Sequence, residues 1–172
     1  SGSTPWNYTL SLGSGYDSNV LRLSSKEISN AGQNPELLGS SQYFDSFVTK
    51  YGFSLKKDLW VNNNKNLLFG SKFSNSNYAH TPEKRHWSGA IHITYKWGSY
   101  KNLKYSLTHL DKFYLRHYIN SNELEACYFS DRNNSISLTH RISQRSWVAL
   151  GVGFLQRYYN QPFTEFDLDI TY

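Results

Sequence analysis

The chain of 172 residues has the length of about one domain, and with 38% hydrophobic residues and a mean hydropathy of −0.62 it is polar for a protein that buries a core. Aromatic residues reach 17%, which argues against disorder, and no stretch is apolar over the ~18 residues of a transmembrane helix. The single cysteine, Cys127, excludes an internal disulfide, and the net charge of +5 is compatible with nucleic acid, an anionic membrane surface or plain solubility.

Residues 1–5 read as a linker or a remnant of expression, and no basic and apolar leader stands at the start, so we expect a mature or trimmed chain. From there, alternation of apolar and polar residues dominates, and helical spacing is nearly absent. The fourth alternating run is the clearest, with Ile91 and Ile93 on one side and His92 on the other. The alternation predicts strands, in chain order, at residues 6–13, 46–56, 67–74, 87–97, 103–108, 135–142, 148–154 and 165–172.

The connections between these strands alternate in length. Long ones are expected at 17–42, 75–85, 111–133 and 157–162, and short ones at 62–65, 98–102 and 143–145. Short periplasmic turns and longer outer loops are typical of outer-membrane barrels, whose tilted strands of about nine to eleven residues cross the bilayer. The sequence therefore predicts an all-β fold, an eight-stranded antiparallel up-and-down transmembrane β-barrel. Residues 1–172 would form one domain in the bacterial outer membrane, with both termini periplasmic.

The apolar set of each strand is bulky and carries Trp and Tyr near the strand ends, where aromatic girdles lie in membrane barrels. We therefore expect this set to face lipid and the polar set to line the interior. The aromatic residues concerned are Trp6, Tyr8, Trp60, Trp87, Tyr95, Trp97, Trp147 and Tyr172.

Eight strands leave an interior that side chains fill, so we expect a closed lumen. Buried charges of one sign are costly, so acidic and basic side chains are expected to pair across it. The alternative is a narrow ion channel along the acidic stripe of the last strand. The expected lumen charges are Glu165, Asp167 and Asp169 on the acidic side and Lys50, Lys56, Lys72, Lys96, Lys104 and Arg141 on the basic side.

His92 is the one histidine expected on the lumen side of a strand, where it would serve as a general base beside Ser88 or Ser106. No spacing in the sequence places a carboxylate near it, so a hydrogen-bonded structural histidine is favoured. No pair of histidines has metal-ligand spacing within one element, and neither a metal nor a cofactor is expected.

The long connection 111–133 reads as a hairpin extension turning at Asn120, Ser121 and Asn122. Its mixture of rings and basic residues would bind an anionic glycan or a protein partner. A simpler interpretation is that the basic residues of this loop face the phosphates of lipopolysaccharide. Nucleic acid is not expected, because an outer surface rarely meets it. Cys127 suggests an intermolecular disulfide or a lipid attachment, although burial within the hairpin is favoured. The candidate residues are Lys112, Phe113, Tyr114, Arg116, Tyr118 and Cys127.

Two segments resemble known families. The ending Phe166 to Tyr172 resembles the C-terminal signal that the barrel-assembly machinery recognises, and the plan of eight strands is similar to small barrels typified by the OmpA membrane domain. The segment Gly15-Tyr16-Asp17-Ser18-Asn19 is similar to one in barrel domains of surface lipoprotein assembly modifiers, which usually have more strands. The resemblance to surface lipoprotein assembly modifiers implies a role in export or envelope biogenesis.

We therefore predict a non-enzymatic barrel that serves as a membrane anchor or as a subunit of an envelope or export assembly. Its partners would be outer-membrane lipids, lipopolysaccharide, the barrel-assembly machinery and an envelope protein. A lipid-modifying enzyme is the third alternative, because the lipid A palmitoyltransferase and deacylase use this kind of scaffold. The contiguous His-Ser pair of the deacylase does not occur here, and the polar interior argues against an acyl pocket.

Overall fold

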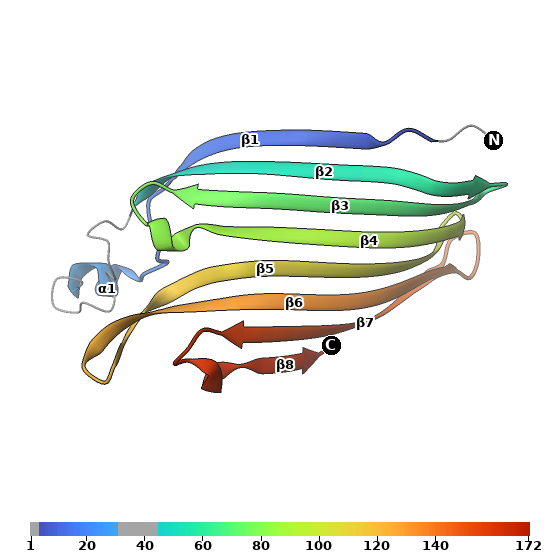
Figure 1. Ribbon diagram of the computed structural model, residues 1–172. Coiled ribbons are helices and arrows are strands. Elements are labelled where there is room, and N and C mark those ends of the chain that lie inside the picture. The colour runs from blue at the N-terminus through green and yellow to red at the C-terminus, as the bar shows by residue number, and fades with distance from the viewer. Residues whose placement is uncertain (1–3, 31–44) are drawn as a thin grey trace.

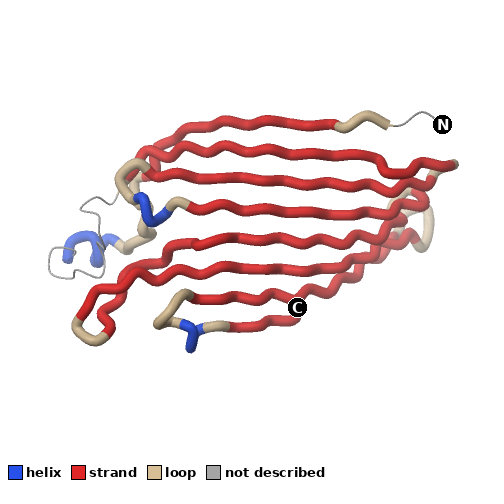
Figure 2. The backbone as a smooth tube through the Cα atoms, in the orientation of Figure 1, coloured by secondary structure: helices blue, strands red, loops and turns tan. Residues whose placement is uncertain are grey.

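The computed structural model describes residues 4–30 and 45–172 and consists almost entirely of strands (Figures 1 and 2). Part of the expected linker, 1–3, and part of the expected loop 17–42 lie outside the described residues. In chain order the elements are β1 (Asn7–Asp17), α1 (Ser25–Asn30), β2 (Ser46–Asn62), β3 (Lys65–Tyr78), the 3-10 turn η2 (Pro82–Lys84), β4 (His86–Gly98), β5 (Lys101–Asn120), β6 (Glu123–Arg141), β7 (Trp147–Tyr159), the 3-10 turn η3 (Thr164–Phe166) and β8 (Leu168–Thr171).

The strands form one sheet in the order β1 to β8, and each is antiparallel to its neighbours. This confirms the expected all-β, up-and-down arrangement. The short connections lie at one end of the sheet and the long ones at the other, which we call the short-turn end and the long-loop end (Figure 1). The β2–β3 turn uses Asn63 and Asn64 at φ 40° and 53°, as two-residue hairpins with a type I′ geometry require.

The long-loop end contains more strand than the sequence suggests. The expected connection 111–133 is a continuation of β5 and β6 that turns at Ser121 and Asn122, so the expected hairpin extension is confirmed. Likewise β3 continues to Tyr78 and β7 to Tyr159. No helix in the described chain is long and apolar enough to cross a membrane.

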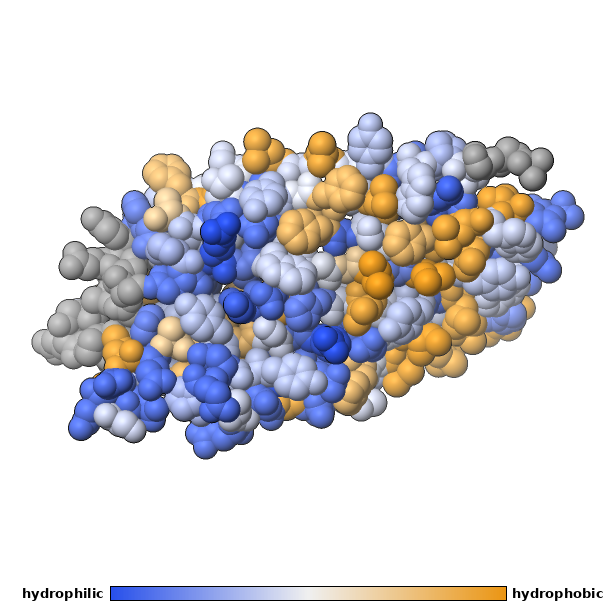
Figure 3. Space-filling model, viewed as in Figure 1, coloured by the Kyte–Doolittle hydropathy of each residue, from blue (hydrophilic) through white to orange (hydrophobic). Residues whose placement is uncertain are grey.

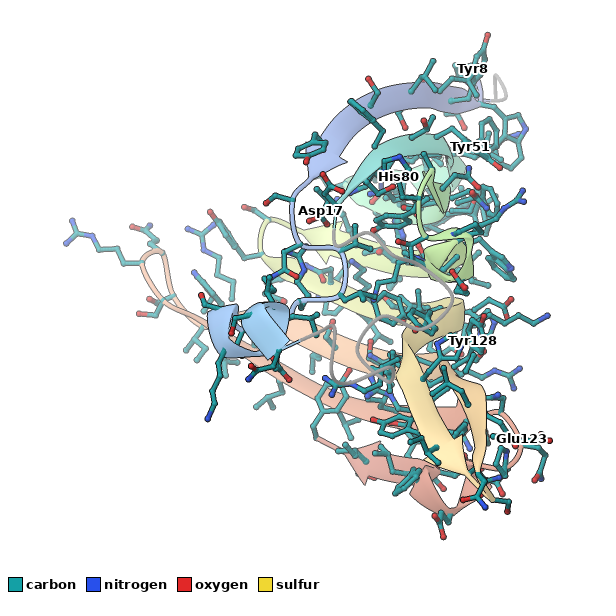
Figure 4. All side chains as sticks on the ribbon, turned by 90° about the vertical axis from the view of Figure 1, so that its left-hand side faces the viewer. Tyr8, Asp17, Tyr51, His80, Glu123 and Tyr128 are labelled. Atoms are coloured by element: carbon teal, nitrogen blue, oxygen red, sulfur yellow. The ribbon has the colours of Figure 1, made fainter. Side chains whose placement is uncertain are left out.

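The sheet is open, in contrast to the expected closed barrel. No pairing joins β1 to β8 among the described residues, and these strands lie at opposite edges of the sheet (Figures 1 and 4). A barrel closes only when its first and last strands run alongside each other with a consistent stagger. β8 has four residues and pairs only with the part of β7 between Phe154 and Arg157, apart from backbone bonds between Tyr172 and Gly153.

Alternation gives the sheet two distinct faces. One register row joins Ser11, Gly52, Ser74 and Ser88, and we call this side of the sheet the polar face. The next row, with Leu10, Phe53 and Phe73, lies on the opposite side, the apolar face. Within the described residues, no second layer covers the apolar face: Leu10 is 75% exposed, Leu12 82% and Leu150 64%.

The apolar region of this face runs obliquely across the register. The row that begins with apolar Leu10, Phe53 and Phe73 ends with His109, Arg132, Gln156 and Asp169. Nearer the short-turn end, the row through Leu67, Tyr95, Leu103, Leu138 and Leu150 is apolar throughout. Figure 3 shows the same trend on its visible side, with hydrophobic residues gathered toward the short-turn end and polar ones at the long-loop end.

Candidate functional site: the polar face and the long-loop end

The polar face carries a set of basic side chains surrounded by small ones. Lys50 lies opposite Gly13 and Ser76 in the register, and Lys72 lies opposite Ser54 and Ala90. Lys104 is flanked by Thr94 and Ser137. The register places on this face every basic residue that the sequence assigns to the lumen: Lys50, Lys56, Lys72, Lys96, Lys104 and Arg141.

The acidic residues of the expected charge network lie elsewhere. Glu165 is in η3, and Asp167 accepts a hydrogen bond from the backbone N–H of Tyr159 at 2.6 Å. Asp169 pairs with Gln156 on the apolar face. The structure therefore brings none of the three into contact with the basic residues of the polar face.

The alternation phase of the last strand differs from the sequence prediction. Leu168, Ile170 and Tyr172 turn toward the polar face, where the Tyr172 hydroxyl is hydrogen-bonded to Asn133 at 2.8 Å. The Tyr172 ring covers Gly153 so closely that a Cβ there would lie 2.2 Å from it. In a strand, a shift of one residue moves every side chain to the other face, and here the register with β7 sets that phase.

In the part of the chain that the structure describes, no ion pair within 4.0 Å joins a carboxylate to any of the six basic residues that the sequence assigns to the lumen. Arg141 instead donates to the backbone carbonyls of Ser143 and Gln144. The guanidinium–carboxylate pairs are near the long-loop end, where Arg22 meets Asp17 at 3.4 Å and Arg157 binds both oxygens of Asp131 at 2.7 and 2.8 Å.

The imidazole of His92 packs against Gly70, where an added Cβ would lie 2.2 Å from the ring. Ser106 is its register partner in β5, whereas the Ser88 hydroxyl is engaged with Ser74 at 2.7 Å. The described residues hold no group of three His, Cys, Asp or Glu side chains suited to a metal ion. Among residues 4–30 and 45–172, no carboxylate lies within 4.0 Å of a His92 ring nitrogen, the place of the group that orients a catalytic imidazole in a Ser-His-Asp triad.

At the long-loop end, the chain after β1 folds into a tight loop, residues 17–24, that we call the Asn19 loop. The Asn19 side chain accepts from the N–H of Leu23 at 2.9 Å and donates to its carbonyl at 2.7 Å, while Asp17 accepts from the N–H of Asn19. Ser24 and Glu27 then form a reciprocal capping box at the start of α1. Asp17 and Asn19 of the Gly15–Asn19 segment therefore shape this loop.

The Asn19 loop packs on the hairpin of β5 and β6 and forms a small core. Leu21 and Leu23 are buried against Tyr114, which is 1% exposed, and Ala126 and Tyr128 complete the cluster. The Tyr114 hydroxyl is hydrogen-bonded to Nδ1 of His117 at 2.7 Å. Burial raises the pKa of Tyr114 and lowers the pKa of His117, so both groups are held neutral near pH 7.

Lys84 of η2 is buried beside this core, a position that sequence reasoning missed. Its Nζ donates to the Tyr114 carbonyl at 2.8 Å and lies 4.4 Å from the centre of the Phe113 ring. Burial, with a smaller contribution from the charge of Arg22, lowers the pKa of Lys84 to about 8. A lysine in a connecting segment carries no signal of burial in the sequence, because only the tertiary packing encloses it.

A row of rings crosses the long-loop end. Neighbouring ring centres are 5.0 to 6.4 Å apart, and the Arg157 guanidinium lies 4.0 Å from the centre of the Phe129 ring. The hydrogen bonds from Arg157 to Asp131 raise the pKa of the guanidinium. The row contains, from β3 to η3, Tyr78, His86, Phe113, Phe129, Tyr159 and Phe166.

The residues of the expected glycan or partner loop are dispersed over several environments. Lys112 is exposed at a bulge with φ 48°, Phe113 belongs to the row of rings, and Tyr114 is buried. Arg116 is close enough to Glu27 to lower the pKa of that carboxylate, after the larger effect of its bonds to Ser24, and Tyr118 packs on Phe163 at 5.5 Å. They do not form one accessible surface.

Cys127 is 2% exposed and is therefore buried in the hairpin, as the favoured interpretation expected. Burial raises the pKa of its thiol, which lowers the thiolate fraction on which disulfide exchange and acylation depend.

Comparisons with models of protein families, with curated proteins and with solved structures find no match for this chain. The resemblances to small outer-membrane barrels and to surface lipoprotein assembly modifiers therefore stay predictions.

Proposed function

We propose that the chain forms one wall of an outer-membrane β-barrel, with its apolar face against lipid, and that it serves as a non-enzymatic anchor or subunit of an envelope assembly. The observation that carries the proposal is the exposed apolar face. A single Leu removed from water contributes roughly 2 kcal/mol, so a sheet that leaves Leu10, Leu12 and Leu150 in water would be unstable.

The oblique course of the apolar region supports lipid as the medium on that face. Strands of membrane barrels tilt by roughly 35–45°, so the boundary of the bilayer crosses the register rows diagonally. The change along one row from Leu10 and Phe53 to Arg132 and Asp169 fits that geometry. A docking site for one protein would have no reason to follow the tilt across all the strands.

An aromatic pair at the short-turn end also supports a lipid boundary. Tyr95, on the apolar face, and Trp97 are stacked with ring centres 5.7 Å apart. Amphipathic rings concentrate where hydrocarbon meets lipid headgroups. The short-turn end would then lie at the periplasmic interface.

The open edges set a condition on this proposal. In hydrocarbon every backbone N–H and C=O must be paired, so β1 and the free edge of β7 and β8 require strand partners. We infer that strands outside the described sheet complete the barrel. We propose an anchor role in preference to a catalytic one because two candidate catalytic side chains are engaged in structural contacts. His92 packs on Gly70, and the Ser88 hydroxyl is hydrogen-bonded to Ser74.

The membrane proposal is tested by flotation with phospholipid vesicles and by the mobility of unheated samples in SDS. We expect the protein to float, and to shift in mobility on boiling. Leu12→Lys and Leu150→Lys should weaken insertion, because a lysine on the lipid face costs about 2–4 kcal/mol at the bilayer midplane. The matched control is Ser11→Lys, a neighbour of Leu12 on the polar face.

A protein that stays soluble without detergent and shows no shift contradicts the membrane proposal. The assembly role has a separate readout, namely purification from native membranes in mild detergent. If the chain purifies without other proteins, the assembly role is contradicted and the anchor role remains.

A further inference from the structure

We infer that the polar face is the wall of an anion-selective path, and that the completed barrel passes small inorganic anions, such as chloride, in preference to cations. This inference rests on the proposed membrane barrel. The charge selectivity that it predicts is opposite to the one expected of an ion channel lined by the acidic residues of the last strand.

The lysines form a track along the strands. Lys50 lies nearest the long-loop end, in the row of Gly13 and Ser76. The next polar-face row, that of Gly52 and Ser74, contains no lysine. The four rows that follow it toward the short-turn end carry, in turn, Lys72, Lys56, Lys104 and Lys96. Polar-face positions along one strand are about 7 Å apart, so an anion passing along the face would meet a new ammonium group within about 7–14 Å, comparable to a Debye length.

The carboxylates on this face do not neutralise the track. Asp17 and Asp131 are near the long-loop end and bind Arg22 and Arg157. Asp58, near the short-turn end, accepts a hydrogen bond from the Asn66 side chain at 2.9 Å. Within residues 4–30 and 45–172, the five lysines have no carboxylate at ion-pair distance, so the middle of the face is electropositive.

There is room for hydrated ions beside the lysines. A trough of about 510 Å³ lies over β1, β2 and β3, and a Cβ added to Gly13 would meet nothing within 4 Å. Hydroxyl and ammonium groups are donors, which suit anions, and rings of Lys or Arg are how anion pores select. The polar part of the trough lining is Thr9, Ser11, Gly13, Lys50, Gly52, Ser54, Lys72 and Ser74.

Low-dielectric walls strengthen the effect of these charges. Closing the barrel would focus the field of the lysines into the lumen and concentrate anions there. The competing arrangement is a lumen in which acidic side chains of the completing strands pair with the same lysines. Such a lumen would be neutral and would show no preference for anions.

The test is the reversal potential of the protein in planar bilayers under a gradient of potassium chloride. We expect a reversal potential of the sign that preferential permeation of chloride gives. In the triple variant Lys50→Glu, Lys72→Glu, Lys104→Glu, the permeability ratio of chloride to potassium should fall by about fivefold or more. The matched control is Lys57→Glu, which makes the same change beside Lys56 but on the apolar face, where Lys57 lies over the Trp6 ring.

The outcomes separate this inference from the proposed function. Cation preference, absence of selectivity, or selectivity that the triple variant leaves unchanged overturns the anion path. A protein that floats with vesicles and shifts on boiling but does not conduct also overturns it, while the barrel stands. A protein that does not enter the vesicles overturns both.

Discussion

The middle of the sheet and its long-loop end expose opposite kinds of side chain. In the middle, Leu10 and Leu12 project outward and the small polar residues Ser11 and Gly52 lie on the other face. At the long-loop end, Leu21, Leu23 and Tyr114 are buried beneath a loop, as in a water-soluble protein. The two regions thus place their apolar side chains in opposite ways, exposed in the middle of the sheet and buried at the long-loop end. In the proposed membrane barrel this change would mark the boundary between lipid and water.

The two regions also differ in how polar groups are held. At the long-loop end Asp17, Asn19 and Asp131 have specific hydrogen-bond partners. In the middle, Lys50 and Lys72 stand among small residues with no ion pair in the described part of the chain. Figure 4, which looks onto the long-loop end, shows Asp17 at the end of β1 and Glu123 at the tip of the hairpin. The lysines in the middle of the polar face therefore act through long-range electrostatics and not through specific ion pairs.

The largest expected effect comes from Tyr114→Ala, which would remove the centre of the small core. Truncating a buried aromatic ring costs about 3–5 kcal/mol, so the Asn19 loop should detach while the strand pairs persist. Amide hydrogen exchange should show loss of protection at residues 19–23 and little change in β1 to β4. Tyr114→Phe, which loses only the bond to His117, should cost about 1 kcal/mol. Equal loss of protection across the whole sheet would contradict the separation of the two regions.

A smaller effect is expected for Asn19→Ala, because it would remove two hydrogen bonds to Leu23 that each contribute about 1 kcal/mol. Limited proteolysis should cut the Asn19 loop faster, with the sheet intact. Asn19→Asp keeps the acceptor for the Leu23 N–H and loses the donor, so its cleavage rate should be intermediate. An unchanged rate in Asn19→Ala would mean that burial of Leu21 and Leu23 alone holds the loop.

The smallest effect is a pH dependence set by Lys84. The folded state lowers the pKa of Lys84 to about 8 from an ordinary value of 10.5, so between these values the unfolded chain binds more protons than the folded one. Stability of the long-loop end should therefore rise from about pH 8 to 10.5. Below pH 8 the full cost of the buried charge is present. Denaturant unfolding followed by hydrogen exchange would measure this slope.

The control for that slope is Lys84→Met, which keeps an unbranched side chain at the buried position and removes the titrating group. Its long-loop end should lose the part of the slope that Lys84 contributes between pH 8 and 10.5. If the native protein and the Lys84→Met variant show the same slope, Lys84 is not the group that causes it.

Sequence reasoning located much of the sheet and part of the candidate site. Alternation identified all the strands and placed Lys50, Lys72 and Lys104 on one face, because neighbouring side chains in a strand point to opposite sides. The turn residues Ser121 and Asn122 marked the hairpin, since both adopt the positive φ that such turns need. Burial of Lys84 and Tyr114 could not be found, because segments far apart in the chain enclose them.

The amino-acid sequence by itself determined the strands and the faces that most of their side chains occupy, because period-two alternation is a local property of the extended backbone. Only the tertiary structure decided the phase of β8, where pairing with β7 turns Tyr172 to the polar face and Asp169 away from it. It likewise decided that the sheet stays open, since closure depends on which strands lie beside β1. The polar composition belongs to a sheet whose apolar face is exposed in its middle. Leu10, Leu12 and Leu150 are exposed on that face, and the net charge of +5 includes the lysines of the polar face.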